Sequence, residues 1–197
     1  MTRQARKCWF VLALSFCSAC APLPPGEIPP APDRQSQAVV FDIDGTLTPR
    51  VAAIHTARPD AARAVRMLAD KGYAVFYVSA RRTWLSSGIP EFLRKNGFPA
   101  GTVLVAQDHA DMHDPVGFKS RKLAEIKDQG WHVALAYGDS STDFEAYSHE
   151  GVPKEDVYAL RRDGKQECQP GVFLKCLGGW TEHLGFLESL PPPSPAP

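Results

Sequence analysis

Five runs of hydrophobic residues divide the middle of the chain. They cover residues 38–41, 73–78, 102–106, 131–137 and 156–160, and they are rich in valine, alanine and aromatic residues. Each run is nearly unbroken, whereas a strand with one face in water would alternate between hydrophobic and polar positions. Unbroken runs are typical of parallel strands that are covered on both faces. The pattern therefore predicts a sheet of about five parallel strands.

Helical spacing is found between these runs. A first helix has its hydrophobic face at Ala61, Ala64, Val65 and Leu68, and Gly72 ends it. Further helices are predicted over about 83–95, over about 119–129, after Asp139, and around Leu184, Leu187 and Leu190. Strands and helices that alternate in this way predict a doubly wound, Rossmann-like α/β domain.

Proline marks the ends of this domain. Of 18 prolines, six lie between positions 22 and 32 and five between 191 and 197. We therefore assign 37–190 to one folded domain, 20–36 to a solvated linker and 191–197 to a disordered tail. An extended linker from 21 to 37 reaches at most roughly 50 Å.

The first 19 residues have the pattern of a secretory signal peptide. Three basic residues precede an apolar run at 8–17, and Ser18 and Ala19 precede Cys20. A helix needs about 20 residues to span a bilayer, so this run is too short. The segment resembles a bacterial lipoprotein signal, which implies lipid on Cys20 and a domain anchored on the periplasmic side of a membrane. The alternative is a plain cleaved signal and a soluble periplasmic or secreted protein.

The charge of the chain argues against nucleic-acid binding, and its cysteines indicate a disulfide. Three of the 22 basic residues and none of the 22 acidic ones precede position 20, so the remaining chain has a formal net charge of −3. A general nucleic-acid-binding protein would normally be basic, so nucleic-acid binding is not expected. Cys168 and Cys176 remain after the signal and anchor cysteines, and in an oxidising compartment they predict a disulfide; in the cytosol they would be two free thiols.

Acidic residues follow two of the predicted strands. Asp42 and Asp44 follow the first, and Asp139 and Asp143 follow the fourth, where a helix begins. The carboxyl ends of parallel strands meet at one edge of a sheet, where ligands bind in open α/β folds. Four carboxylates gathered there require a cation, and hard oxygen ligands favour Mg²⁺. The sequence therefore predicts a magnesium site made by these four residues.

The same segments carry a family resemblance. Residues 39–48, VVFDIDGTLT, resemble the first motif of the haloacid dehalogenase superfamily. Ser79 in YVSAR, Lys119 in GFKSRK and the stretch GDSSTD at 138–143 match the later motifs in order. Within the superfamily, these motif sequences are most similar to those of the lipin and phosphatidylinositol-transfer-protein-associated phosphatase domain.

The resemblance implies a Mg²⁺-dependent phosphatase that forms an aspartyl-phosphate. Asp42 would be the nucleophile, and Asp44 would protonate the leaving group and later activate water, which suits a carboxyl group with a raised pKa. Ser79 would donate a hydrogen bond to the phosphoryl group, and Lys119, or alternatively Lys122, would supply fixed positive charge. Three further residues are assigned to substrate binding: Gly45, Thr46 and Arg81, the last of which alternatively offsets the charge of the aspartates.

Other candidates are weaker. His109, Asp111 and His113 have metal-like spacing, but we expect a solvated loop there, with a contact to the rim of the site or to substrate as the alternative. Trp84, Leu85 and Trp180 are interpreted as packing residues rather than a lipid-facing patch.

No sizeable cap domain fits between the motifs. About ten residues separate Thr48 from the first helix, and a helix, a strand and a loop fill 82–118. An uncapped site admits a large or membrane-embedded substrate, which favours phosphatidate or a related lipid phosphate. The alternatives are a soluble-substrate acid phosphatase acting on nucleotides or sugar phosphates, and a phosphatidate-binding module without catalysis, against which Asp42 argues.

Overall fold

The computed structural model describes residues 23–33 and 36–193, without the side chain of Thr83. The predicted signal peptide, Cys20 and the last four residues lie outside this part of the chain. Among the described helices, none combines the length and the hydrophobicity that crossing a bilayer requires.

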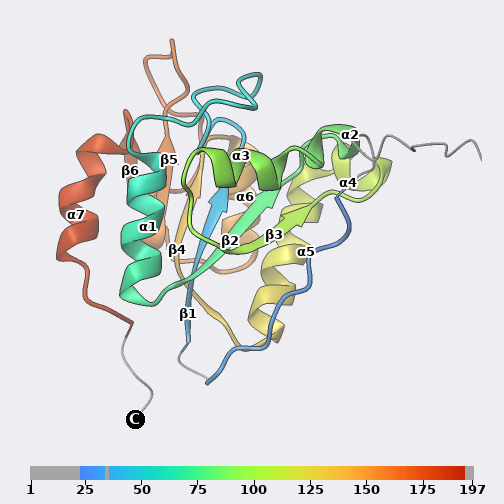
Figure 1. Cartoon of the computed structure of the whole chain (residues 1–197), viewed down its shortest axis with the longest axis horizontal. Coiled ribbons are helices and arrows are strands. Elements are labelled where there is room, and N and C mark those ends of the chain that lie inside the picture. The colour runs from blue at the N-terminus through green and yellow to red at the C-terminus, as the bar shows by residue number, and fades with distance from the viewer. Residues whose placement is uncertain (1–22, 34–35, 194–197) are drawn as a thin grey trace, which may run out of the picture.

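A parallel sheet of six strands forms the centre of the domain (Figure 1). The strands lie in the order β3-β2-β1-β4-β5-β6, and every neighbouring pair is parallel. Their bounds are β1 (Gln37–Asp42), β2 (Ala74–Ser79), β3 (Thr102–Val105), β4 (His132–Gly138), β5 (Val157–Leu160) and β6 (Lys175–Leu177). Five coincide with the predicted runs. The sequence did not indicate β6, because it has three residues and two of them are exposed.

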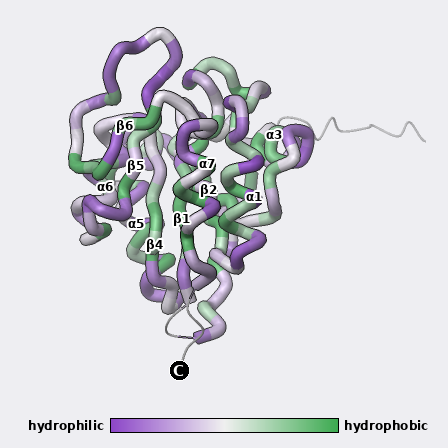
Figure 2. Tube along the Cα trace, turned by 90° about the vertical axis from the view of Figure 1, so that its left-hand side faces the viewer, coloured by the Kyte–Doolittle hydropathy of each residue, from purple (hydrophilic) through white to green (hydrophobic). Residues whose placement is uncertain are grey.

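Helices cover both faces of the sheet. Their bounds are α1 (Ala61–Lys71), α2 (Thr83–Ser86), α3 (Ile89–Lys95), α4 (His109–His113), α5 (Pro115–Asp128), α6 (Ser141–His149) and α7 (Leu184–Ser189), with short 3₁₀ turns η2 (Lys154–Asp156) and η3 (Thr181–His183). One core joins the sheet to α1, α3 and α7, and the other joins it to α5 and α6. Figure 2 shows the hydrophobic strands enclosed between these layers. The doubly wound α/β prediction is confirmed, and no cap-sized insertion interrupts the described chain.

Three predicted segments differ in the structure. The helix expected over 83–95 is two helices, α2 and α3, and Pro90 occupies the first turn of α3, where its missing N–H leaves no hydrogen bond unmade. The loop expected at 109–113 is the helix α4, because the Asp108 side chain caps it by accepting the Asp111 N–H at 2.9 Å. The helix after it begins at Pro115, so Lys119 lies in its second turn rather than at its start.

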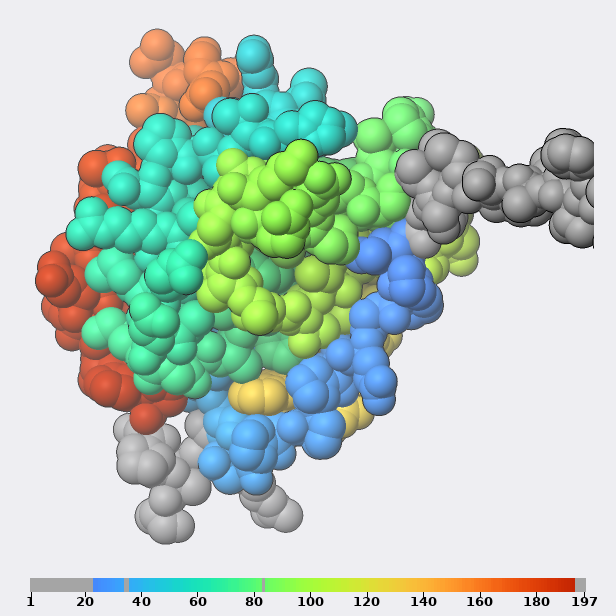
Figure 3. All heavy atoms as spheres, in the orientation of Figure 1, coloured from blue at the N-terminus to red at the C-terminus, as the bar shows by residue number. Residues whose placement is uncertain are grey.

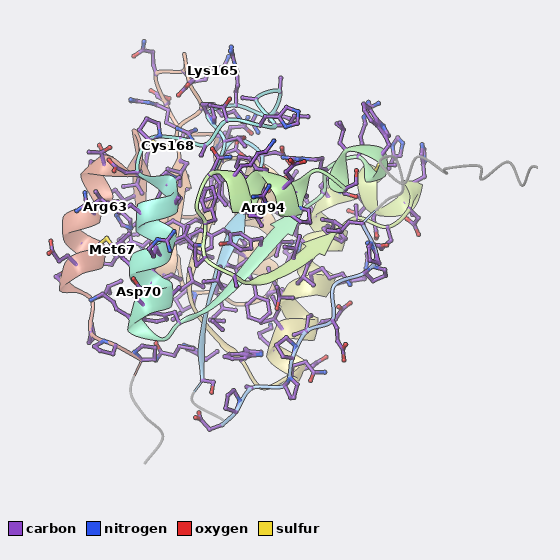
Figure 4. The ribbon with its side chains drawn as sticks, in the orientation of Figure 1. Arg63, Met67, Asp70, Arg94, Lys165 and Cys168 are labelled. Atoms are coloured by element: carbon purple, nitrogen blue, oxygen red, sulfur yellow. A yellow bond between two sulfur atoms is a disulfide. The ribbon has the colours of Figure 1, made fainter. Side chains whose placement is uncertain are left out.

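The predicted disulfide joins Cys168 to Cys176, with Cα atoms 5.8 Å apart. Cys176 belongs to β6, and Cys168 lies in the loop that leads to it from β5 (Figure 4). The bridge therefore fastens the short edge strand to its own connecting loop.

The described part of the proline-rich linker lies against the domain instead of standing free in solvent. The Leu23 N–H donates to Ser86 Oγ at 3.1 Å, and the Trp131 indole N–H donates to the carbonyl oxygen of Pro29 at 2.8 Å. A side chain at Gly26 would collide with the carbonyl oxygen of Val103 in β3. Figure 3 shows the segment following the surface of the domain.

Trp180 is a core residue, as expected. Its ring is fully buried and lies 4.9 Å from that of Tyr137 and 5.9 Å from that of Phe41. Its indole N–H donates to the carbonyl oxygen of Thr46 at 3.0 Å. Trp180 therefore ties the core to the loop that follows β1.

His183 makes the fold sensitive to acid. The imidazole is buried beside Tyr137 and Tyr158, its Nε2 lies 3.0 Å from the Tyr137 hydroxyl oxygen, and burial lowers its pKa to about 4. The unfolded chain takes up this proton below about pH 6.5, whereas the folded chain does so only near pH 4. The neutral histidine therefore contributes stability above pH 6.5 that is lost as the pH falls towards 4.

We expect His183→Gln to lose less stability than the wild-type protein between pH 7 and pH 5, by on the order of 1 kcal/mol. Glutamine can keep a hydrogen bond to Tyr137 but does not titrate. Urea denaturation at both pH values measures the difference. Equal losses in the two proteins would contradict this account of His183.

Candidate active site

The carboxyl ends of β1, β2 and β4 lie side by side. Phe41 is level with Tyr77 in β2 and with Tyr137 in β4, so the residues that follow these three positions emerge at one edge of the sheet. This edge is where the sequence predicts the chemistry.

Asp42 is the last residue of β1 and is almost fully buried. Its Oδ1 atom lies 2.6 Å from Lys119 Nζ, and its Oδ2 atom accepts a hydrogen bond from the Thr46 hydroxyl at 3.1 Å. The turn between them needs Gly45, which has φ +96°, and a side chain at this position would collide with the carboxylate of Asp139. Thr46, assigned to substrate binding, thus contacts Asp42 itself.

Lys119, rather than Lys122, lies at this site. Its ammonium group contacts both Asp42 and Asp143, and the residue is 5% exposed. Lys122 is on the outer side of α5, where it pairs with Glu125 at 2.8 Å. Of these two lysines, only Lys119 can supply charge to the acidic edge.

Asp139 and Asp143 come from the start of α6. The Asp143 carboxylate accepts the N–H groups of Asp139 at 3.0 Å and Ser140 at 2.9 Å, so the backbone at the helix start fixes its position. Asp139 is paired with Arg162, a residue that follows β5 and that sequence reasoning missed. No local motif marks Arg162, because strand order alone brings it next to β4.

Three of the four predicted metal ligands come together. Oxygen atoms of Asp42, Asp139 and Asp143 all lie within 4.8 Å of one another, and within the described chain this is the one group of three or more acidic, histidine or cysteine residues with such geometry. A ligand set made only of carboxylate oxygens fits a hard divalent cation such as Mg²⁺. The fourth predicted ligand, Asp44, does not join this cluster, because its carboxylate contacts Ser79 and Arg81 instead.

Asp44 is held by two residues that were expected to bind phosphate. Arg81 Nη2 lies 2.7 Å from Asp44 Oδ1 and Arg81 Nε lies 3.1 Å from Oδ2, and the Ser79 hydroxyl donates to Oδ2 at 2.9 Å. Arg81 therefore offsets the charge of an aspartate, which was the alternative for this residue. This two-point pair occupies both oxygens of Asp44, so it must open before the Asp44 side chain can contact a leaving group.

The charges at the edge are incompletely balanced. Burial raises the pKa of Asp42, and the nearby Asp143 raises it further against the opposing effect of Lys119. Burial also raises the pKa of Asp139, which the hydrogen bond from Arg162 opposes. Burial alone would lower the pKa of Lys119, but Asp143 and Asp42 together outweigh it and raise that pKa. Three carboxylates face two cationic side chains, and a divalent cation would supply the missing positive charge.

Arg58 is a second residue that the sequence did not reveal. It is 4% exposed, and its guanidinium donates to the carbonyl oxygens of Gly45 at 2.6 Å, Thr48 at 3.1 Å and Arg161 at 2.8 Å. It thereby joins the loop after β1 to the segment after β5. Because its partners are backbone atoms from distant segments, no local pattern could identify it.

A cavity of about 640 Å³ adjoins Asp44 and Arg81. Both histidines of α4 line it, with the Nε2 atoms of His109 and His113 3.1 Å apart. Asp111 is turned elsewhere, because it accepts the Gln107 N–H at 3.0 Å. The two histidines therefore lie at the rim of the site, and the three residues do not form a metal site.

Known proteins resemble this chain in sequence and in fold. Human membrane-associated phosphatidylinositol transfer protein 3 is 29% identical over 160 residues, which are 79% of this chain and 16% of that protein. Protein retinal degeneration B of Drosophila melanogaster is 26% identical over 167 residues, which are 82% of this chain and 13% of that protein. The chain thus spans less than a fifth of these relatives.

A solved structure, that of the Pnkp1/Rnl/Hen1 RNA repair complex, contains a chain of the same α/β fold. The two chains have a TM-score of 0.54 and are 18% identical, over 78% of this chain and 49% of the other. A family model described as the LNS2 domain of PITM 1-3 matches residues 39–161, which include the three clustered aspartates, Lys119 and the Asp44–Arg81 pair. The chain therefore belongs to the LNS2 domain family.

Proposed function

We propose that this chain is a Mg²⁺-dependent phosphatase that hydrolyses phosphate monoesters through an aspartyl-phosphate on Asp42. The observation that carries the proposal is the setting of Asp42. Its carboxylate is buried at the edge of the sheet, 2.6 Å from Lys119 Nζ and within reach of a cation held by Asp139 and Asp143. Binding of phosphate alone does not require a carboxylate opposed to it.

Asp42, Asp139 and Asp143 would hold the ion. When bound, it supplies positive charge that offsets the repulsion between the Asp42 carboxylate and the incoming phosphate. Lys119 adds a second fixed charge on the same side, and the Thr46 hydroxyl orients one oxygen of Asp42 so that the other can attack.

The reaction then proceeds in two steps. An Asp42 oxygen forms a bond to phosphorus, the bond from phosphorus to the ester oxygen breaks, and the leaving alkoxide takes a proton from Asp44. In the second step Asp44 takes a proton from water, the hydroxide displaces Asp42 from phosphorus, and free phosphate leaves. This cycle regenerates the Asp42 carboxylate and the protonated Asp44 with which it began.

Arg81 and Ser79 hold Asp44 in place until a phosphate binds. Both now donate to Asp44, and both are groups that bind phosphate oxygens well. A substrate phosphate that takes over these donors would release Asp44 from its ion pair, so that its carboxyl group can turn towards the leaving oxygen.

A lipid phosphate is the substrate that we favour. The cavity beside Asp44 has an apolar wall, and one of the relatives, the human protein, is by name a membrane-associated phosphatidylinositol transfer protein. Soluble phosphomonoesters and phosphatidate binding without catalysis are the alternatives.

Purified protein is expected to hydrolyse phosphatidate or lysophosphatidate, to lose activity in EDTA and to recover it when Mg²⁺ returns. Phosphate release from each member of a substrate panel, which also contains nucleotides and sugar phosphates, measures this activity. Mg²⁺ should also raise the melting temperature, by a few degrees, because the acidic edge lacks positive charge. Brisk activity in EDTA would contradict the metal-dependent mechanism, and saturable phosphatidate binding without hydrolysis would favour the non-catalytic alternative.

A further inference from the structure

The cavity beside Asp44 has an exposed apolar rim. Its larger apolar lining residues are Val51, Ile54, Trp84, Leu85 and Met112. Of these, Val51 is 51% exposed and Trp84 is 61% exposed, although transfer of such side chains out of water is favourable. They come from two separate segments, the loop after β1 and α2, and they meet at one opening. Trp84 was expected to be a packing residue, and the structure exposes it instead.

The charged part of the same lining has a net positive charge. Arg81 and Arg82 line the cavity with one carboxylate, Asp44, which is paired with Arg81, so Arg82 supplies the excess positive charge; His109 and His113 add imidazole groups that can form hydrogen bonds. A surface that combines exposed aromatic and aliphatic groups with basic groups is complementary to anionic lipid headgroups above an acyl region.

The N-terminal segment enters the domain at this rim. The Leu23 N–H donates to Ser86 Oγ in α2 at 3.1 Å, and the Gln107 side-chain amide, just before α4, donates to the Leu23 carbonyl oxygen at 3.4 Å. These two helices also supply Trp84 and Met112 to the cavity. Figure 1 shows the first described residues beside α4, and the chain then runs along the domain towards β1.

This path changes the reach of an N-terminal anchor. A free linker of 17 residues would allow any orientation, but only Ala21 and Pro22 lie between Cys20 and Leu23. The three steps along the chain from Cys20 to Leu23 span at most about 11 Å. A lipid on Cys20 would therefore bring the bilayer surface close to α2 and α4, and with them to the opening of the cavity.

We propose that the rim formed by Val51 and Trp84 is the surface with which this chain lies on a phospholipid bilayer. The packed segment from Leu23 onwards fixes the orientation, and Arg82 and the two histidines face the headgroups. This inference deepens the proposed function, because it directs the catalytic edge towards a substrate that need not leave the membrane.

Quenching of tryptophan fluorescence by brominated phospholipid tests the contact without catalysis. The chain after residue 20 has three tryptophans: Trp84 at the rim, Trp131 next to Pro29 and the buried Trp180. Vesicles of phosphatidylcholine and phosphatidylserine, with bromine on the acyl carbons near the headgroup, are mixed with the mature protein in EDTA. Wild-type protein should lose roughly a third of its emission, the share of one tryptophan in three.

Matched variants identify the residue responsible. Trp84→Phe should abolish the quenching, and Trp131→Phe, at the opposite edge of the sheet, should retain it. Thermal melting establishes that both variants fold. Quenching that persists in Trp84→Phe, or its absence in the wild-type protein, would overturn the docking surface. Phosphatidate hydrolysis without quenching overturns the surface and leaves the proposed enzyme intact, whereas quenching without hydrolysis supports the surface and overturns the enzyme.

Discussion

Replacement of Asp42 by asparagine is expected to lower phosphate release by at least about 10⁴-fold while leaving the fold intact. An amide is a poor nucleophile and cannot form the acyl-phosphate. Its oxygen can still accept a hydrogen bond from Lys119, and its NH2 group can donate to the Thr46 hydroxyl oxygen; these two residues contact the carboxylate at 2.6 and 3.1 Å in the wild-type protein. Steady-state hydrolysis of the best substrate from the panel measures the loss, and thermal melting establishes folding.

Asp163→Asn is the matched control for this variant. Asp163 lies in the loop after β5, has a side chain that is 62% exposed and makes only a 3.8 Å contact with Arg58. We expect its activity to stay within about twofold of wild type, since exposed pairs contribute little. Near-normal turnover of Asp42→Asn would eliminate the aspartyl-phosphate mechanism, whatever the substrate.

Replacement of Lys119 by methionine is expected to cost about 3–5 kcal/mol of the free energy of unfolding in EDTA. Methionine has a similar length but no charge. Asp42 and Asp143, both buried and both in contact with Lys119 Nζ, would lose their shared cation and face each other unscreened. Urea denaturation measures the loss, which Mg²⁺ should reduce because the ion can take over part of the compensation.

Lys122→Met provides the comparison on the same helix. Its partner Glu125 is a surface residue three positions away, so we expect a change within about 0.5 kcal/mol. If Lys119→Met were as stable as Lys122→Met, the charge balance inferred for the acidic edge would be wrong.

The sequence by itself determined the strands and the carboxylates that follow them. A strand buried on both faces must be hydrophobic along its whole length, so Val39, Val40 and Phe41 predict β1. The helical spacing of the hydrophobic residues from Ala61 to Leu68 predicts α1. Asp42 and Asp139 could be placed at one edge because parallel strands end at the same side of a sheet. These features depend on residues close together in the chain.

Contacts between distant segments were decided only by the tertiary structure. Asp44 was expected at the metal, but its partner Arg81 comes from the end of β2 and turns it away. Arg58 contacts the carbonyl oxygen of Arg161, and Arg162 pairs with Asp139. Both contacts form because β5 lies beside β4, and no local sequence pattern encodes that pairing. The segment beginning at Leu23 has a composition typical of a free spacer, yet its hydrogen bonds to Ser86 and Gln107 hold it on the domain. Composition determines what a segment can do in solvent, whereas its position depends on which surface the rest of the fold presents to it.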